Sequence, residues 1–452
     1  MKFSEKVFKA YDIRGKVPAE LTPELVRNIG RAFADFLPPG KVAVGRDMRL
    51  DSEELARAFV EGLLKQGREV LDLGRITSDM IYFAVGKMAL AGGAMITASH
   101  NPGEYNGIKL TGQGVSPIGE DTGLEEIKSA VAGDTYKPES ANGSASVTDI
   151  LDEWIDHALS FAPNLAPLKV GVDAGNGMAG IDVAELEAKT PLKVEGIYLE
   201  PDGNFPNHPA NPLVKENLAD LSALVRSKKL DCGIAFDGDG DRAILVDENG
   251  EPISPSVVGA MLAEQFLKAS PGATVLYNAI TSRVVADTIK KLGGKGVRTK
   301  VGHSFIKQLM REKSAVFACE HSGHYYFKAN YNADSGLIAA LCVLAVMSQS
   351  GQRLSELVSN YTGKYFDSGE INFAVKDKGK AMGEVTGAFP DGQTDTLDGL
   401  SVNYADWWFN LRPSNTEPLL RLNVEATSQS EMQQKLEKIK KILQKHLDPS
   451  KN

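Results

Sequence analysis

The stretch AMITASHNP at residues 94–102 joins an apolar run to a polar turn. The run predicts a buried strand, and the Asn-Pro pair predicts a tight, non-helical turn after it. Ser99 therefore lies at a strand end, which is where α/β proteins keep their chemistry. The Gly-x-Ser-x-Gly frame of the α/β-hydrolases is missing, so Ser99 is not their nucleophile. His100 and Lys109 are near in sequence, but a polar turn without function is the simpler interpretation of this stretch alone.

A second apolar run, CGIAF at residues 232–236, leads into the segment DGDGDR at 237–242. Carboxylates at Asp237, Asp239 and Asp241 project to one side of an extended chain. The intervening glycines let the backbone curl, so that three oxygens can converge on one hard cation. We expect a metal site here rather than a solvated acidic turn, because three adjacent carboxylates repel each other without a cation. An EF-hand is excluded, because Arg242 stands where that loop requires glycine.

Three further segments accompany these two: YDIRG at 11–15, EHSGH at 320–324 and RPSNTEP at 412–418. Taken in their order along the chain, the five segments resemble the signatures of the α-D-phosphohexomutase family, and within it the bacterial phosphomannomutase/phosphoglucomutase group. They span nearly the whole chain, and together they are far more specific than any one of them. The fold, the activity and the site residues of that family are therefore expectations for this chain.

The bulk composition limits the class of protein. A chain of 452 residues with 42% hydrophobic and 24% charged residues is typical of a soluble protein with two to four domains. A formal net charge of −9 argues against nucleic acid as a partner. The sequence shows no signal peptide, and no run approaches the ~18 apolar residues that span a membrane. We expect a cytoplasmic protein whose three cysteines, Cys232, Cys319 and Cys342, are buried reduced thiols.

Strand-like runs alternate with helix-like patterns along the chain, which indicates α/β layers. The resemblance implies three related α/β domains with mixed sheets and a smaller C-terminal α+β domain around a central cleft. Polar or glycine-rich segments at 140–144, 247–250 and 360–364 suggest where the domains meet. The expected units are a phosphoserine domain (1–145), a metal-binding domain (146–248), a sugar-recognition domain (249–363) and a phosphate-binding domain (364–452).

The resemblance assigns the chemistry to Ser99 as a phosphate carrier. Its phosphorylated form would contribute an oxygen to a Mg²⁺ ion held by Asp237, Asp239 and Asp241, because this ion suits hard oxygen ligands and phosphate. Phosphoryl transfer needs positioning and charge neutralisation more than covalent help. Arg242 supplies a cation beside the cluster, either for the substrate or only to balance the carboxylates.

Proton transfer and orientation are expected from residues near Ser99. Lys109, His100 and His324 are the candidates for the general acid and base, since the attacking hydroxyl loses a proton and the bridging oxygen regains one. Arg14 is expected nearby, where it would orient the transferring group. His157 and His446 lie on helical patterns outside any motif, and we expect them to be structural.

Substrate recognition is expected from two other segments. Glu320 and Ser322 would bind vicinal sugar hydroxyls, since a carboxylate accepts and a hydroxyl also donates. Tyr11 and His303 are further candidates by resemblance. A cradle for the phosphate that is not reacting would be formed by Arg412, Ser414, Asn415 and Thr416. The neighbouring pair Trp407-Trp408 is expected to serve packing.

These expectations combine into a phosphohexomutase that interconverts mannose 6-phosphate and mannose 1-phosphate, and also the glucose phosphates. A hexose 1,6-bisphosphate would be both intermediate and activator. His321 stands where bifunctional relatives often have Met, and Thr281-Ser282-Arg283 is not preceded by a Lys that some relatives carry. Amino-sugar phosphates therefore remain open as substrates. A metal-dependent sugar phosphatase and a phosphosugar-binding protein are the other classes. The chain is expected to be a monomer or a homodimer.

Overall fold

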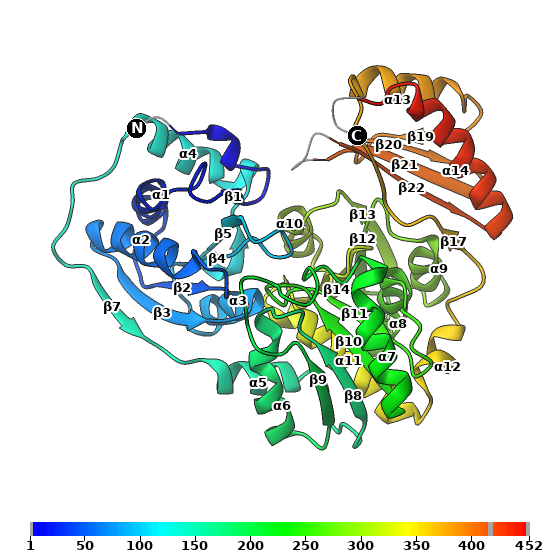
Figure 1. Ribbon diagram of the computed structural model, residues 1–452, viewed down its shortest axis with the longest axis horizontal. Coiled ribbons are helices and arrows are strands. Elements are labelled where there is room, and N and C mark those ends of the chain that lie inside the picture. Colours follow the sequence, from blue (N-terminus) through cyan, green and yellow to red (C-terminus); the bar gives the residue numbers. More distant parts are fainter. Residues whose placement is uncertain (1–2, 415–418, 449–452) are drawn as a thin grey trace.

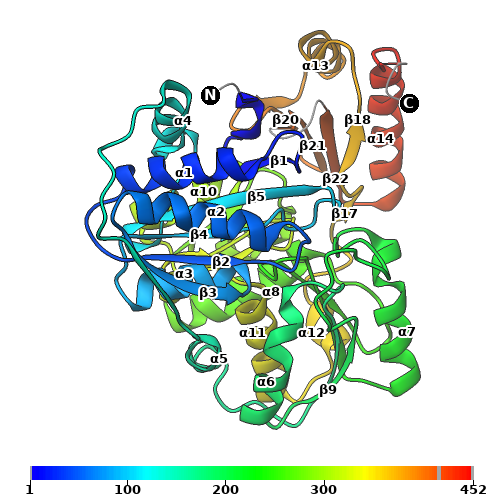
Figure 2. The ribbon, with the colours of Figure 1, turned by 60° about the vertical axis from the view of Figure 1, so that its left-hand side comes forward.

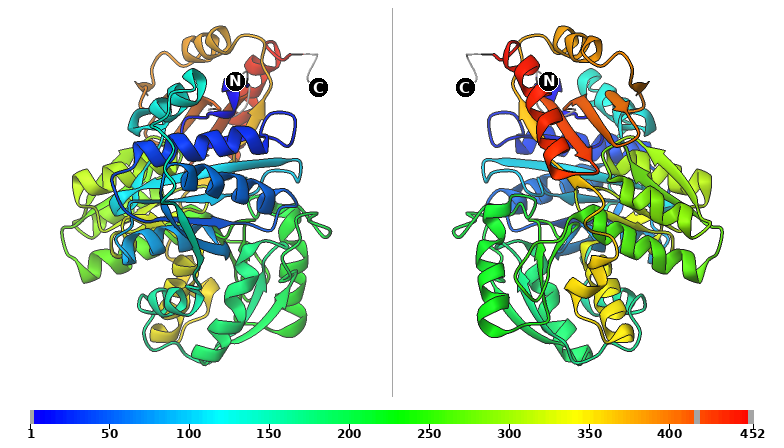
Figure 3. Two further views of the ribbon diagram at one scale, coloured as in Figure 1. Left: turned by 90° about the vertical axis from the view of Figure 1, so that its left-hand side faces the viewer. Right: turned by 90° about the vertical axis from the view of Figure 1, so that its right-hand side faces the viewer.

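The computed structural model describes residues 3–414 and 419–448. Four β-sheets follow one another along the chain, each with helices packed against it (Figure 1). The fourth sheet with its helices and the second sheet lie far apart, with the third sheet between them and the first sheet to one side (Figures 1 and 3). Within the described residues, no helix is both long and apolar enough to cross a membrane.

The first sheet and its helices contain the strands β1 (Ile13–Lys16), β2 (Val42–Arg46), β3 (Glu69–Arg75), β4 (Gly92–Ile96), β5 (Tyr105–Gly112), β6 (Ser116–Pro117) and β7 (Ser144–Val147), and the helices α1 (Pro23–Phe36), α2 (Ser52–Lys65), α3 (Ser78–Lys87) and α4 (Leu124–Gly133). The strand order is β1-β5-β4-β2-β3-β7, with β6 beside β5. Helices α1 and α2 pack on one face and α3 on the other (Figure 2). Side chains alternate accordingly: Val42 and Val44 join the α1 and α2 core, and Ala43 joins the α3 core.

The second sheet is smaller and contains the strands β8 (Lys169–Asp173), β9 (Lys193–Ile197), β10 (Cys232–Phe236) and β11 (Ala243–Val246), with the helices α5 (Leu151–Leu159), α6 (Val183–Lys189) and α7 (Ala219–Lys228). Its strand order is β11-β10-β8-β9. His157 on α5 packs among aromatic rings, including Phe83 and Trp154, and bonds Asn330 at 3.0 Å. This is the structural role expected for it.

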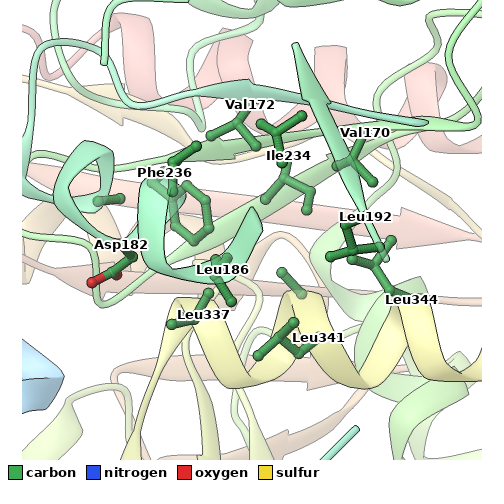
Figure 4. A pocket seen from close by; sticks show the side chains of 14 residues that line it. Val170, Val172, Asp182, Leu186, Leu192, Ile234, Phe236, Leu337, Leu341 and Leu344 are labelled. Atoms are coloured by element: carbon green, nitrogen blue, oxygen red, sulfur yellow. The ribbon is translucent and has the colours of Figure 1, made fainter. Parts of the chain in front are cut away.

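The third sheet and its helices contain the strands β12 (Thr274–Asn278), β13 (Lys295–Thr299), β14 (Phe317–Cys319), β15 (Tyr325–Phe327) and β16 (Ala333–Asp334), and the helices α8 (Pro255–Ala269), α9 (Arg283–Lys291), α10 (His303–Lys313), α11 (Gly336–Ser350) and α12 (Leu354–Ser359). The order is β13-β12-β14-β15-β16. Helix α11 also packs against the second sheet: Leu337 and Leu341 face Ile234 and Phe236 across a small apolar cavity of about 30 Å³ (Figure 4).

The fourth sheet contains the strands β17 (Phe366–Asp367), β18 (Ile371–Phe373), β19 (Gln393–Asp395), β20 (Leu400–Asn403), β21 (Trp407–Pro413) and β22 (Leu420–Ala426), with the helices α13 (Lys378–Gly387) and α14 (Gln429–Gln444). All of its described pairs are antiparallel. Trp407 and Trp408 are buried, which confirms their packing role. Ser428 caps α14 by accepting a hydrogen bond from the Glu431 amide at 3.2 Å.

The first three sheets repeat one topology. The orders β5-β4-β2-β3, β11-β10-β8-β9 and β15-β14-β12-β13 are equivalent, with three parallel strands and one antiparallel strand at the end. The connection to the antiparallel strand is therefore the same loop in each repeat. These loops carry Ser99, the three aspartates and Glu320, so the fold places the main predicted segments at equivalent positions.

Candidate active site

Ser99 lies in the loop between β4 and β5 and is almost completely buried, with 4% of its surface exposed. Its backbone is left-handed, with φ of +51°, a conformation that costs about 1–3 kcal/mol for a residue other than glycine. The Ser99 amide donates to Thr97 Oγ1 at 2.9 Å, and the hydroxyl donates to Asp237 Oδ2 at 2.7 Å. His100 Nδ1 is 3.1 Å from the same hydroxyl. The Ser99 hydroxyl of the first repeat therefore touches the acidic loop of the second.

The three aspartates converge as the sequence predicted. Each offers a carboxylate oxygen, and these oxygens lie within 4.8 Å of one another. Asp239 Oδ1 and Asp241 Oδ1 are buried and have no hydrogen-bond partner in the described part of the chain. A set of buried carboxylate oxygens with free lone pairs fits a hard divalent cation such as Mg²⁺.

Two cations balance the acidic loop. Lys109 Nζ donates to Asp239 Oδ2 at 2.6 Å and to Asp241 Oδ2 at 2.5 Å. Arg242 Nε donates to Asp237 Oδ2 at 2.9 Å. Burial raises the pKa of Asp237 to about 6, although Arg242 opposes the rise. Burial would also raise the pKa of Asp239, but the adjacent Lys109 lowers it overall.

The predicted acid–base candidates differ in protonation. Burial, followed by Arg242 and Arg14, holds the pKa of His100 well below its usual value, so His100 is neutral at pH 7. Burial opposes the charged form of Lys109, but the aspartates raise its pKa well above the usual value. Lys109 is therefore protonated and can donate but not accept a proton. The pKa of His324 is raised, because Asp241 and then Asp334 outweigh its burial.

The His324 ring is held by the carboxylate of Asp334. Its Nδ1 lies 2.8 Å from Asp334 Oδ2 and 3.8 Å from Asp241 Oδ1. Asp334 in turn pairs with Lys307, whose Nζ is 2.8 Å from Asp334 Oδ1. The imidazole is thus oriented at the edge of the acidic loop.

Glu320 is fixed by donors from three elements. Its carboxylate accepts from Tyr326 Oη at 2.5 Å, Asn278 Nδ2 at 2.9 Å and the Gly302 amide at 3.4 Å. Ser322 is in the same loop and is partly buried. The Glu320 loop and the β12 strand end therefore form one polar cluster next to α10.

The remaining predicted residues of the first and third repeats border these groups. Arg14 on β1 forms an ion pair with Asp12 and donates to Asn101 Oδ1 at 2.6 Å, beside the Ser99 loop. The ring of Tyr11 meets that of His303 edge-on, with centroids 5.5 Å apart. Burial, followed by Lys307, holds the pKa of His303 well below its usual value, so the ring is neutral.

Arg412 and Ser414 belong to the fourth sheet. Arg412 Nη2 donates to Glu370 Oε2 at 2.8 Å, and Glu370 also pairs with Arg421 at 3.2 Å. The Ser414 amide donates to the Leu419 carbonyl at 2.9 Å. Asn415 and Thr416 lie outside the described residues. The fourth sheet meets the third repeat where Asp398 accepts from the Val301 amide, two residues before His303.

Sequence patterns did not reveal the residues that support this site. Ser78, the first residue of α3, donates to Asp239. Asn278 and Tyr326 hold Glu320, and Asp334 holds His324. Asn278 directly follows the apolar run Val275-Leu276-Tyr277, and this is the one signal that the sequence offers among these residues. Their partners lie in other repeats or on neighbouring strands, so only the fold brings them together.

Family models match the chain in four consecutive pieces. Three are described as "Phosphoglucomutase/phosphomannomutase, alpha/beta/alpha" domains: domain I matches residues 5–137, domain II 152–250 and domain III 254–365. The C-terminal domain of the same family matches 370–442. These four models cover most of the chain in one order.

Individual relatives also match the chain over nearly its full length. A protein described as "Phosphohexose mutases" from Xanthomonas campestris pv. campestris (strain B100) is 42% identical over 423 residues, covering 93% of this chain and 94% of the relative. "Phosphomannomutase" from Escherichia coli (strain K12) is 40% identical over 430 residues, with the same two shares. The crystal structure of a phosphoglucomutase/phosphomannomutase family protein from Burkholderia thailandensis superposes with a TM-score of 0.90, at 32% identity and 98% coverage of both chains.

Three α/β repeats and a C-terminal domain, matched along their length by such relatives, define a phosphohexomutase. The chain belongs to the phosphoglucomutase/phosphomannomutase family.

Proposed function

We propose that this phosphohexomutase interconverts mannose 6-phosphate and mannose 1-phosphate, and also the glucose phosphates, through a phosphoserine at Ser99. The observation that carries the proposal is the contact of the Ser99 hydroxyl with Asp237, inside a cluster of three buried carboxylates and two cations. A hydroxyl in this setting is suited to holding a phosphoryl group, because its negative charge would be balanced from several sides.

The first half of the reaction transfers the phosphoryl group from Ser99 to the free hydroxyl of the substrate. The bond from phosphorus to Ser99 Oγ breaks and a bond to the sugar oxygen forms. The sugar hydroxyl gives its proton to a base, and Ser99 Oγ takes up a proton to regain its hydroxyl. Hexose 1,6-bisphosphate results, and after it turns over in the site its other phosphate returns to Ser99. A Mg²⁺ ion held by Asp237, Asp239 and Asp241, with a phosphoserine oxygen, would withdraw charge from phosphorus.

The proton-handling residues would act from fixed positions. Lys109 is the candidate proton donor near Ser99 Oγ, since the aspartates keep it charged. His100 and His324 remain the candidates for the base, and Arg14 would orient the transferring group. Arg242 would steady the phosphoryl group while it balances Asp237.

Recognition would be divided between the third and fourth domains. Glu320 and Ser322 would bind vicinal hydroxyls in either orientation of the sugar, next to His303 and Tyr11. The phosphate that is not reacting would be cradled by Arg412, Ser414, Asn415 and Thr416. One cradle suffices, because each end of the bisphosphate visits it in turn.

Several wider properties are part of the same proposal. The four domains would be divided at residues 145, 248 and 363, although α11 also packs on the second sheet. We further propose that the enzyme acts on small hexose phosphates in the cytoplasm, as a monomer or homodimer, without nucleic acid or membrane partners. Its three cysteines are buried and free, as expected for a reducing compartment.

The specificity is tested by comparing kcat/KM for the 1-phosphates of mannose, glucose, glucosamine and N-acetylglucosamine, with glucose 1,6-bisphosphate as activator. The proposal predicts the highest value for mannose 1-phosphate, then glucose 1-phosphate. A preference for either amino sugar would replace the sugar assignment. Release of inorganic phosphate without isomerisation would instead indicate a phosphatase.

A further inference from the structure

Arg49, in the loop after β2, is buried beneath the Ser99 loop. Only 3% of its surface is exposed. Its guanidinium Nη1 donates to the carbonyls of Pro102 at 2.8 Å and Tyr105 at 2.9 Å. Its Nη2 donates to the carbonyls of Ser99 at 2.7 Å and Asn101 at 2.6 Å. One side chain therefore gathers four carbonyls of a single loop.

The fifth donor of the guanidinium fixes Arg49 itself. Nε lies 3.2 Å from Asp47 Oδ2, and the Asp47 carboxylate also accepts from the Arg49 amide and the Ser52 hydroxyl. An arginine has five N–H donors in a rigid plane, and all five are used here. The geometry of the four carbonyls is thus set by an anchored, planar group.

The Ser99 loop needs such a constraint. Ser99 has a left-handed backbone, which persists only where the surrounding structure determines it strongly. Its carbonyl also approaches the second repeat closely: a Cβ on Gly238 would lie 2.4 Å from Ser99 O. The position of the Ser99 hydroxyl relative to Asp237 consequently depends on the carbonyls that Arg49 holds.

The equivalent loops of the other repeats contain similar supports. In the third repeat, Asn278 at the end of β12 holds Glu320 in the neighbouring loop. In the second, the Met178 amide after β8 donates to the Gly238 carbonyl of the aspartate loop at 2.9 Å. In each case a residue at or just after the end of the equivalent strand, β2, β8 or β12, supports the functional loop beside it, since the carboxyl ends of parallel neighbours lie at one edge.

We propose that Arg49 is a positioning residue for phosphoryl transfer: it holds the Ser99 loop in the strained conformation that points the hydroxyl at the acidic cluster. This inference rests on the proposed role of Ser99. Arg49 is buried and the guanidinium donors are all used within the protein, so it should affect the chemical step and leave substrate binding nearly unchanged.

Arg68 provides a matched control in the same domain. Its guanidinium also gathers four carbonyls, those of Ala34, Leu37, Pro38 and Gly40. These carbonyls lie at the end of α1 and before β2, whereas Ser99 follows the carboxyl end of β4. Loss of the Arg68 guanidinium removes a comparable set of hydrogen bonds without touching the Ser99 loop.

The experiment compares Arg49→Lys with Arg68→Lys and the wild type. Lysine keeps the charge but cannot reach four carbonyls from one nitrogen. We expect Arg49→Lys to lower kcat about a hundredfold with KM within about threefold, because a small misplacement of a reacting group costs that much. The rate of Ser99 phosphorylation by glucose 1,6-bisphosphate should fall in parallel. Arg68→Lys should lower Tm by about as much as Arg49→Lys does, but its kcat should stay within about twofold of the wild-type value.

The inference is overturned if folded Arg49→Lys retains kcat, or if both variants lose kcat equally. Where Arg49→Lys does not fold, Asp47→Asn replaces it: it loosens the anchor and keeps the guanidinium. That variant should lose kcat about tenfold, and an unchanged kcat would contradict the inference. Failure of the proposed function can be distinguished from failure of this inference, because the wild type itself would then form no phosphoserine and show no isomerisation.

Discussion

The Ser99 loop and the Glu320 loop occupy the same place in two copies of one topology, yet they are held in different ways. Arg49 binds the backbone carbonyls of the Ser99 loop. In the third repeat, Asn278 and Tyr326 bind the Glu320 side chain. The first arrangement fixes the backbone of the loop and thereby the position of the Ser99 hydroxyl. The second fixes the orientation of the Glu320 carboxylate.

This difference suits the two tasks that we propose for these loops. A group that exchanges a phosphoryl must be placed accurately against the acidic cluster, because transfer depends on positioning. A recognition group needs its acceptor oxygens oriented toward the sugar hydroxyls. Changes at the first loop should therefore reduce kcat, and changes at the third repeat and the fourth sheet should mainly raise KM.

The largest effect is expected from Ser99→Ala. Removing the hydroxyl abolishes the covalent route, so kcat should fall by roughly three orders of magnitude or more. Steady-state assay of mannose 1-phosphate conversion measures this. Ser144→Ala, on the exposed strand β7, is the control and should match the wild type. More than about a tenth of the wild-type activity in Ser99→Ala would remove Ser99 from the chemistry.

Asp239→Asn should have the second largest effect. It removes one charge from the cation site and weakens the contact with Lys109, so kcat should fall roughly a hundredfold and recover partly at high Mg²⁺. Activity is measured over a Mg²⁺ titration. The control is Asp220→Asn, which changes an aspartate on helix α7, outside the acidic loop. Full wild-type activity in the presence of a chelator would contradict a metal role.

Arg412→Ala tests the recognition side. Loss of a charge-assisted contact of about 1.5–3 kcal/mol should lower kcat/KM roughly ten- to hundredfold, mainly through KM. Arg353 is exposed and supplies the control, Arg353→Ala. A kcat/KM of Arg412→Ala within about twofold of the wild-type value would remove Arg412 from phosphate binding.

The smallest effect is expected from Tyr326→Phe. Glu320 loses one donor while its other contacts remain, so KM should rise about five- to tenfold with kcat nearly constant. Tyr325→Phe is closely matched, since Tyr325 is equally buried but donates to the Pro255 carbonyl. It should change Tm and leave KM unchanged. Equal KM values in the two variants would show that Tyr326 does not position Glu320.

Local structure was largely predictable from sequence. Thr22 caps α1 with Pro23 in its first turn, and Leu55, Phe59 and Leu63 form a buried stripe on α2 at helical spacing. These features depend on neighbours in the chain, which the sequence displays directly. The convergence of the three aspartates was predictable for the same reason.

The supports of the site could not be predicted in this way. Arg49, Asn278 and Asp334 act on loops that are far away in the chain or on a neighbouring strand, and their sequence neighbourhoods resemble ordinary turns. The packing of α11 on the second sheet likewise depends on tertiary contacts. Periodicity reveals which face of an element is apolar, but not which distant element covers it.

The central claim is that Ser99 carries the phosphoryl group between the two ends of the sugar. The direct test first loads the protein with glucose 1,6-bisphosphate and maps the phosphorylated residue by mass spectrometry. The desalted protein is then mixed with mannose 1-phosphate in a single turnover. The account predicts that phosphate leaves Ser99 as mannose 1,6-bisphosphate forms in equal amount. Phosphate on another residue, or release of inorganic phosphate without bisphosphate, would contradict it.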